Sequence, residues 1–187
     1  MLFMVCLFTW CQPARAISIK QEMELADEIM KVIRSRFELI EDPLIVEYVN
    51  RVGKKILNQL PAQPFNFHFY VINEPVYNAF AIPAGHIFIH SGLLSAMDSE
   101  EELAGILAHE ITHAARRHIS HRIENSKKVN LATMAGMLAG IFLGVASGDP
   151  SVAQALTIGS AAAGQSVSLA YSRQDETEAD QLGLKYL

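Results

Sequence analysis

The chain has few cysteines and no excess of positive charge, and both features limit the classes of function that it can have. Only two of its 187 residues are cysteines, Cys6 and Cys11, and both lie near the N-terminus. A disulfide framework is therefore excluded for the rest of the chain. The 15 lysines and arginines are outnumbered by 20 aspartates and glutamates, giving a net charge of -5. This balance offers no electrostatic reason to bind nucleic acid, and we expect no such partner.

The N-terminal segment "MLFMVCLFTWCQPARA" is an apolar run that ends in small residues around Arg15. This pattern predicts a secretory signal peptide over residues 1–16, with export to the periplasm and possible association with a membrane. No lysine or arginine precedes the apolar run, so an N-terminal anchor is the alternative. Removal of the segment would leave a chain without cysteine, in which strong metal ligands must be histidines and carboxylates.

The remaining residues, 17–187, are enough for one domain. Their periodicity predicts an α+β fold, mostly helical, with a small sheet. Helices are expected over residues 18–37, from Pro43 onward, and from Ser99 to about Glu124, and strands over residues 65–71 and 86–90. The segment "NEPVYNAFAIPAG" between the strands carries turn chemistry. His68, His86 and His90 are expected to be strand or loop histidines and not ligands.

A long stretch between Lys128 and Arg173 has almost no charge. Asp149 is its only charged residue, and it lies in a Gly-Asp-Pro turn that divides the stretch into two apolar halves. The pattern predicts an apolar helical hairpin over residues 129–170. Two placements remain open: a buried hairpin, packed on the domain or at a subunit contact, and association with a membrane surface. The first half is of borderline length for spanning a bilayer.

The segment "AHEITHAARRH", residues 108–118, carries the clearest chemical signal. Residues four apart on a helix project from one face, so His109 and His113 can hold a single ion. Glu110 lies one step round the helix, where its carboxylate can reach a water molecule beside the ion. This is the spacing of the HExxH zinc motif, in which the glutamate is the general base of a hydrolase.

A catalytic zinc usually takes three protein ligands, so a third is needed. The class that continues the motif with glycine and histidine is excluded, because Arg116 and Ile119 stand at those places. His118 comes one position too early and is expected to be solvated on the far side of the helix.

The later segment "YSRQDETEADQLG" offers Glu176 and Asp180, four residues apart on one helical face. Glu176 fits the third ligand, and Asp180 fits an acceptor that holds a ligand imidazole in the correct tautomer. Asp175 and Glu178 are expected to be surface charges.

Three segments together resemble a known family: "NAFAIPAGHIFIHSGLL", "EEELAGILAHEITHAARRH" and "SRQDETEADQLG". They are similar to the gluzincin metallopeptidases that include HtpX and the CAAX prenyl proteases, and most of all to the exported BepA-type branch. The resemblance implies a zincin-like fold with one zinc ion per chain. It makes the zinc ligands His109, His113 and Glu176, the catalytic base Glu110, and a catalytic or supporting acid Asp180. Arg173 stands where such proteins commonly have an arginine.

The predicted function is zinc-dependent hydrolysis of peptide bonds in exported proteins that are misfolded or misassembled, with Glu110 as general base. The strand over residues 86–90 is expected to pair with an extended substrate. The alternatives are a metal-stabilised periplasmic chaperone or binding module with a plugged, inactive cleft, and an integral membrane protease. The resemblance also suggests contact with a membrane surface or the outer-membrane assembly machinery. The sequence ends at "LGLKYL" in mid-helix, so we expect a truncated C-terminus, and the oligomeric state stays open.

Overall fold

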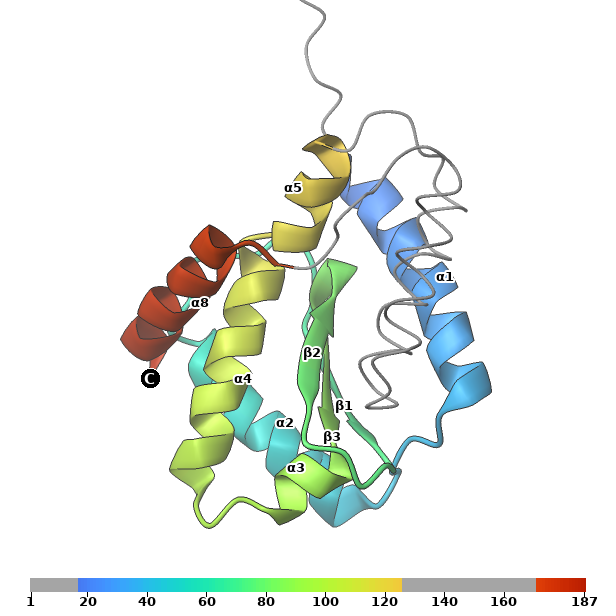
Figure 1. Ribbon diagram of the computed structural model, residues 1–187, viewed down its shortest axis with the longest axis vertical. Helices are drawn as coiled ribbons and strands as arrows, with labels where there is room; N and C mark the ends of the chain where they lie inside the picture. The colour runs from blue at the N-terminus through green and yellow to red at the C-terminus, as the bar shows by residue number, and fades with distance from the viewer. Residues whose placement is uncertain (1–16, 126–170) are drawn as a thin grey trace, which may run out of the picture.

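The computed structural model describes residues 17–125 and 171–187, in which helices surround a small sheet (Figure 1). The elements, in chain order, are α1 (Ile19–Arg36), α2 (Pro43–Leu57), β1 (His68–Ile72), β2 (Ala79–Ile82), the 3-10 turn η1 (Pro83–Gly85), β3 (His86–His90), α3 (Ser91–Ser95), α4 (Glu100–Ala115), α5 (His118–Asn125) and α8 (Arg173–Tyr186). The predicted α+β class is confirmed. The predicted signal peptide and the predicted hairpin over residues 129–170 lie outside the described residues. Among the described helices, none has the length and apolar character needed to cross a membrane.

Side-chain caps set where the long helices begin. Ser18 and Gln21 form a capping box at the start of α1, and Ser172 and Asp175 form another at the start of α8. Ser99 accepts a hydrogen bond from the backbone of the first turn of α4. These local signals explain why the starts of α1 and α4 were visible in the sequence.

The sheet has the order β1-β3-β2, with β3 in the centre. Strand β1 runs parallel to β3, and β2 runs antiparallel to it. Strand β2 was missed by the sequence analysis, which expected only turn chemistry there. Its four residues are too few to show a period, so only tertiary packing reveals it. The first strand also begins at His68, three residues later than predicted.

Two apolar cores lie on opposite faces of the sheet. Helix α1 covers one face, and α2 and α4 cover the other (Figure 1). The α1 side contains the buried residues Leu25, Ile29, Ile33, Ile72, Phe80, Ile82 and Phe88, joined by Ile119 and Ile123 of α5. The other side contains Val49, Val52, Ile56, Phe69, Val71, Ile87, Ile89, Leu103, Leu107 and Ile111. Helix α4 is therefore fixed against the sheet along its length, which gives its functional face a rigid support.

The helix predicted to run from Ser99 to about Glu124 is broken, so that prediction is wrong. It ends at Ala115, and a new helix starts at His118, because Arg117 has a left-handed backbone with φ 54°. This conformation costs a non-glycine residue roughly 1–2 kcal/mol. It is held by the Arg117 guanidinium, whose Nε lies 2.6 Å from Glu22 Oε2 and whose Nη2 donates to the Ile17 carbonyl at 2.9 Å. Glu22 is only 1% exposed, so the turn is held by a buried ion pair.

Two replacements of Arg117 should separate the energy of its ion pair with Glu22 from the cost of its left-handed backbone. Arg117→Ala leaves a buried carboxylate without its partner, and we expect the free energy of unfolding to fall by about 3 kcal/mol. Arg117→Gly loses the same ion pair but tolerates the left-handed backbone, so it should be about 1 kcal/mol more stable than the alanine variant. Urea unfolding measures both values, with Arg36→Ala at an exposed site as the control. Equal stability of the alanine and glycine variants would show that the backbone is not strained.

Candidate metal centre

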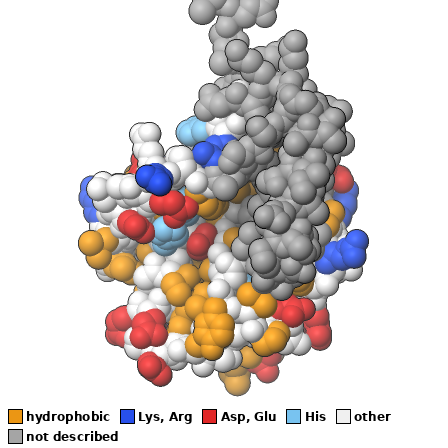
Figure 2. Space-filling model, in the orientation of Figure 1, with side chains coloured by type: hydrophobic (Ala, Val, Ile, Leu, Met, Phe, Trp, Pro, Cys, Tyr) orange, Lys and Arg blue, Asp and Glu red, His pale blue; other side chains and the backbone are white. Residues whose placement is uncertain are grey.

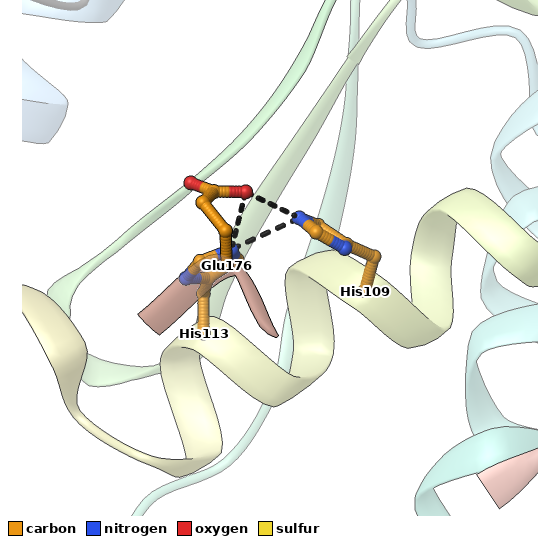
Figure 3. A group of neighbouring side chains, drawn as sticks. All are labelled: His109, His113 and Glu176. Atoms are coloured by element: carbon orange, nitrogen blue, oxygen red, sulfur yellow. Dashed lines mark hydrogen bonds and ion pairs between the residues drawn. The ribbon is translucent and has the colours of Figure 1, made fainter. Parts of the chain in front are cut away.

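Three side chains converge where α8 crosses α4 (Figure 3). His109 and His113 project from successive turns of α4, and Glu176 comes from the first turn of α8. The Nε2 atoms of the two histidines are 3.0 Å apart, and Glu176 Oε2 lies 3.4 Å from His109 Nε2 and 3.9 Å from His113 Nε2. Ligand atoms placed tetrahedrally about 2.0 Å from a zinc ion are about 3.3 Å from one another, so these separations suit such an ion. The structure thus brings together the three ligands proposed from the sequence.

Small residues let α8 approach α4 closely enough for this geometry. Ala179 is fully buried between the helices, and a Cβ atom on Gly183 would lie 3.2 Å from the backbone of Ala108 and His109. A larger side chain at either position would push the helices apart. The spacing of small residues on α8 therefore determines how far Glu176 lies from the two imidazoles.

Asp180 contacts the outer nitrogen of one predicted ligand. Its Oδ1 lies 2.9 Å from His109 Nδ1, while His109 Nε2 faces the other two ligand atoms. An imidazole whose Nε2 is free for a metal carries its proton on Nδ1, so Nδ1–H donates to the carboxylate. The contact is the one expected for Asp180 from the sequence.

Glu110 is buried beside the cluster. Glu110 is only 8% exposed, and its Oε2 has no hydrogen-bond partner among the described residues. Burial and the nearby charge of Glu176 raise the pKa of Glu110 to about 8, against a hydrogen bond from the Ala81 backbone. A divalent cation would favour the ionised carboxylate. The buried Oε2 of Glu110 therefore suits a site that binds a cation.

His113 stays neutral at physiological pH. Burial, followed by the charges of His109 and His118, lowers the pKa of His113 to about 3. A neutral imidazole keeps a lone pair free to bind a metal. This histidine is thus ready to act as a ligand without first losing a proton.

Tyr171 is a site residue that the sequence reasoning missed. Its ring stacks on the His113 ring with centroids 3.7 Å apart, and its hydroxyl donates to the Ala81 carbonyl at 3.3 Å. Burial raises the pKa of Tyr171 well above its usual value, so the hydroxyl stays protonated. Nothing in its local sequence distinguishes it, because only the approach of α8 to α4 places it on the imidazole.

Three residues expected to be solvated are in fact engaged. His118 is 3% exposed and contacts His113, because the turn at Arg117 redirects the chain. Asp175 closes the cap of α8 and accepts from Arg122 Nε at 3.2 Å. Glu178 lies 2.7 Å from Arg116 Nε and 3.1 Å from His118 Nε2. The prediction of a solvated His118 is therefore wrong, whereas Asp175 and Glu178 are partly exposed charges that form ion pairs.

The three strand histidines are not part of the ligand group. His68, His86 and His90 are in the strands, and none belongs to the group of possible metal ligands found in the described part of the chain. His90 is fully buried, which lowers its pKa to about 4. Arg173 is the first residue of α8 and is exposed.

A cleft of about 570 Å³ opens beside His109 and Glu110. Figure 2 shows this face, with a histidine among acidic side chains and hydrophobic side chains gathered below them. The cleft is lined by further residues from the loop before β2, from the start of β2, from α3, α4 and α8, and from the residue after α8: Tyr77, Asn78, Ala79, Leu93, Gly105, Ile106, Ala179, Asp180, Gly183, Leu184 and Leu187. A peptide segment could therefore reach the metal site from one mostly apolar side.

Comparison with known proteins agrees with this geometry. The chain is 34% identical over 171 residues to the beta-barrel assembly-enhancing protease of Escherichia coli K12, and 35% identical over 171 residues to that of Yersinia pestis. Both alignments cover 91% of this chain but 35% of the relative, so the chain spans about a third of their length. The mitochondrial metalloendopeptidase OMA1 of Schizosaccharomyces pombe is 30% identical over 177 residues, which cover 90% of this chain and 47% of that protein.

One family profile, described as peptidase family M48, matches residues 43–187. The match includes both histidines of α4 and the carboxylates of α8 that meet in the structure. It confirms the family predicted from the three sequence segments. This chain therefore belongs to peptidase family M48.

Proposed function

We propose that this protein is a zinc-dependent endopeptidase. The proposal rests on one observation: ligand atoms of His109, His113 and Glu176 converge beside the buried carboxylate of Glu110. Zinc held there supplies Lewis acidity, which lowers the pKa of water from 15.7 to about 7 and polarises a carbonyl group. The donor set of two imidazoles and one carboxylate is typical of a catalytic zinc with a position left for substrate or water.

We assign a different role to each of the side chains around the metal site. Glu110 accepts a proton from the attacking water and passes it to the leaving amine, which is general acid and base catalysis by one carboxylate. Asp180 receives the Nδ1 proton of His109 and so keeps that ring in the tautomer that presents Nε2. Tyr171 holds the plane of the His113 ring by stacking on it.

Strand β2, an edge strand of the sheet formed by the described residues, is our proposed substrate-binding strand. The sequence favours β3 for this role, but β3 is the central strand and is paired on both edges. His90 N–H donates to Asn78 O, so by alternation Ala79 and Ala81 direct their backbone groups away from β3. Ala81 is engaged by Tyr171 and Glu110, whereas Ala79 lines the cleft. An extended substrate can therefore pair with Ala79, which would select unfolded segments.

Removal of the metal tests the proposed activity. The zinc-loaded protein should cleave unfolded casein, and 1,10-phenanthroline should reduce the initial rate to background. One equivalent of zinc per chain should restore it, because the three ligand atoms converge on space for a single ion. Cleavage that persists without metal would refute the proposal. Zinc binding with suppression of aggregation, and no cleavage, would favour the chaperone alternative.

The substrates we propose are misfolded or misassembled exported proteins. The names of the bacterial relatives refer to the assembly of β-barrels and to protease activity. The open edge at Ala79 supports a preference for chains that have not yet paired their strands. Contact with the outer-membrane assembly machinery or a membrane surface is part of this proposal.

We also propose export to the periplasm, with cleavage after Ala16. The structure around Ile17 supports it: the Ile17 backbone N–H donates to Glu124 Oε1 at 2.8 Å, and its side chain packs on the α1 core. Cleavage would convert this N–H into a charged amino group that pairs with Glu124.

The mature protein should therefore begin at Ile17, which intact mass and N-terminal sequencing will measure. Glu124→Gln should destabilise the mature chain by about 1 kcal/mol, as expected for a partly exposed ion pair, and the uncleaved chain by less. A mature N-terminus elsewhere would contradict this proposal.

A further inference from the structure

A chain of four side chains extends outward from one of the predicted metal ligands. His113 Nδ1 lies 2.9 Å from His118 Nδ1, and His118 Nε2 lies 3.1 Å from Glu178 Oε2. The other oxygen of Glu178 lies 2.7 Å from Arg116 Nε. The two imidazoles are buried, with 2% exposure for His113 and 3% for His118.

Only one arrangement of protons agrees with a metal at this site. His113 Nε2 faces His109 and Glu176, so it must be unprotonated to bind a cation. Nδ1 of His113 then carries the proton and donates it to His118 Nδ1, which must be an acceptor. His118 therefore carries its own proton on Nε2 and donates to Glu178, while Arg116 donates to the other oxygen of that carboxylate. Every donor in the chain has an acceptor.

The break in the helix is what makes this contact possible. On an uninterrupted helix, residues 113 and 118 would point about 140° apart and could not meet. The left-handed backbone at Arg117 turns the chain so that His118, the first residue of α5, returns to the His113 ring. Non-glycine residues in such conformations are concentrated at functional sites, where surrounding contacts keep the strain in place. Here the buried pair between Arg117 and Glu22 supplies those contacts.

We infer that His118, held by Glu178, is a positioning residue that fixes the tautomer and ring orientation of His113 for metal binding. The inference rests on the proposed zinc site. His109 reaches a carboxylate directly through Asp180, and His113 reaches one through His118. Both carboxylates belong to α8, which also carries Glu176. Docking of α8 on α4 therefore provides the third ligand and orders both imidazoles at once.

Two substitutions of His118 separate hydrogen bonding from packing. His118→Phe keeps a ring of similar size but removes the acceptor for His113 Nδ1–H. His118→Asn loses ring volume but places an acceptor oxygen near the original Nδ1. Loss of a partner of a ligating histidine typically weakens metal binding about 10–100-fold. We expect this loss of zinc affinity in the phenylalanine variant, and recovery to within about threefold of wild type in the asparagine variant, because the acceptor is restored.

Zinc affinity is measured by competition with a chromophoric chelator, and the tautomer of His113 by 15N NMR of histidine-labelled protein. The wild type should show the Nδ1–H form of His113, and His118→Phe should show a mixture. His121→Phe, at an exposed position of the same helix, is the matched control and should leave both unchanged. Glu178→Ala, at a half-exposed position, provides a second test if the phenylalanine variant does not fold, with zinc binding expected to weaken about three- to tenfold.

The outcomes separate this inference from the proposed function. If folded His118→Phe or Glu178→Ala binds zinc within twofold of wild type and keeps the same His113 tautomer, the positioning role is wrong. If asparagine fails to restore what phenylalanine loses, packing and not the acceptor is responsible, and the inference is again overturned. A wild-type protein that binds no zinc would instead refute the proposed function.

Discussion

Replacing Glu110 with glutamine should reduce kcat for casein cleavage about 10³-fold and leave zinc affinity within about twofold of wild type. Glutamine has nearly the same shape as glutamate but cannot accept the proton of the attacking water, and general base catalysis contributes about 10²–10⁴-fold. Glu110 is not one of the three converging ligands, so the metal should remain bound. Initial rates and zinc content per chain provide the two measurements.

Glu110→Gln should also change how the stability of the metal-free protein depends on pH. Burial and the charge of Glu176 raise the pKa of Glu110 to about 8, so the folded state binds a proton between pH 4.5 and 8 that the unfolded state has lost. Stability of the metal-free wild type should therefore fall as pH rises through this range. Glu110→Gln has no such proton, and its stability should depend less on pH.

Glu101→Gln serves as the control, because Glu101 is exposed in the first turn of the same helix. It should change neither the cleavage rate nor the pH dependence of stability. A Glu110→Gln protein that retains zinc and cleaves casein at the wild-type rate would show that another group is the base.

The sequence was informative where the physics is local. The helix starts at Ser18 and Ser99 were predictable because both side chains bond to backbone groups within their own first turns. The candidate ligands were predictable because a spacing of four on a helix places His109 beside His113, and Glu176 beside Asp180. Neither inference required knowledge of which elements pack together.

What the sequence did not reveal depends on contacts between distant segments. The left-handed turn at Arg117 is held by Glu22, 95 positions earlier, and arginine itself carries no signal for that backbone. A continuous helix would place His118 on the side away from His113, so the sequence alone does not predict its contacts with His113 and Glu178. Strand β2 likewise exists because β3 pairs with it, and its four residues show no clear period.

Zinc should stabilise the wild type but not the Glu176→Gln variant. A ligand at one hundred times its Kd stabilises the folded state by about 2.7 kcal/mol, or roughly 5–10 °C in Tm for a chain of this size. Glutamine replaces the charged ligand with a neutral one. If zinc affinity falls 100-fold, the same zinc concentration contributes only about 0.4 kcal/mol. Thermal unfolding with and without zinc measures the difference.

Without metal, the order of stability should be reversed, so that Glu176→Gln is no less stable than the wild type. In the wild type without metal, burial and repulsion by the negative charge of Glu176 keep Glu110 protonated above the usual carboxyl pKa, which costs stability as the pH rises. Glutamine removes that repulsion, and the metal-free variant should be at least as stable as the metal-free wild type. Gln181→Ala, at an exposed position of α8, should behave as wild type in both states. A variant that merely disturbed the packing of α8 would be less stable with and without zinc, so a reversal of order on adding zinc can arise only if Glu176 holds the ion.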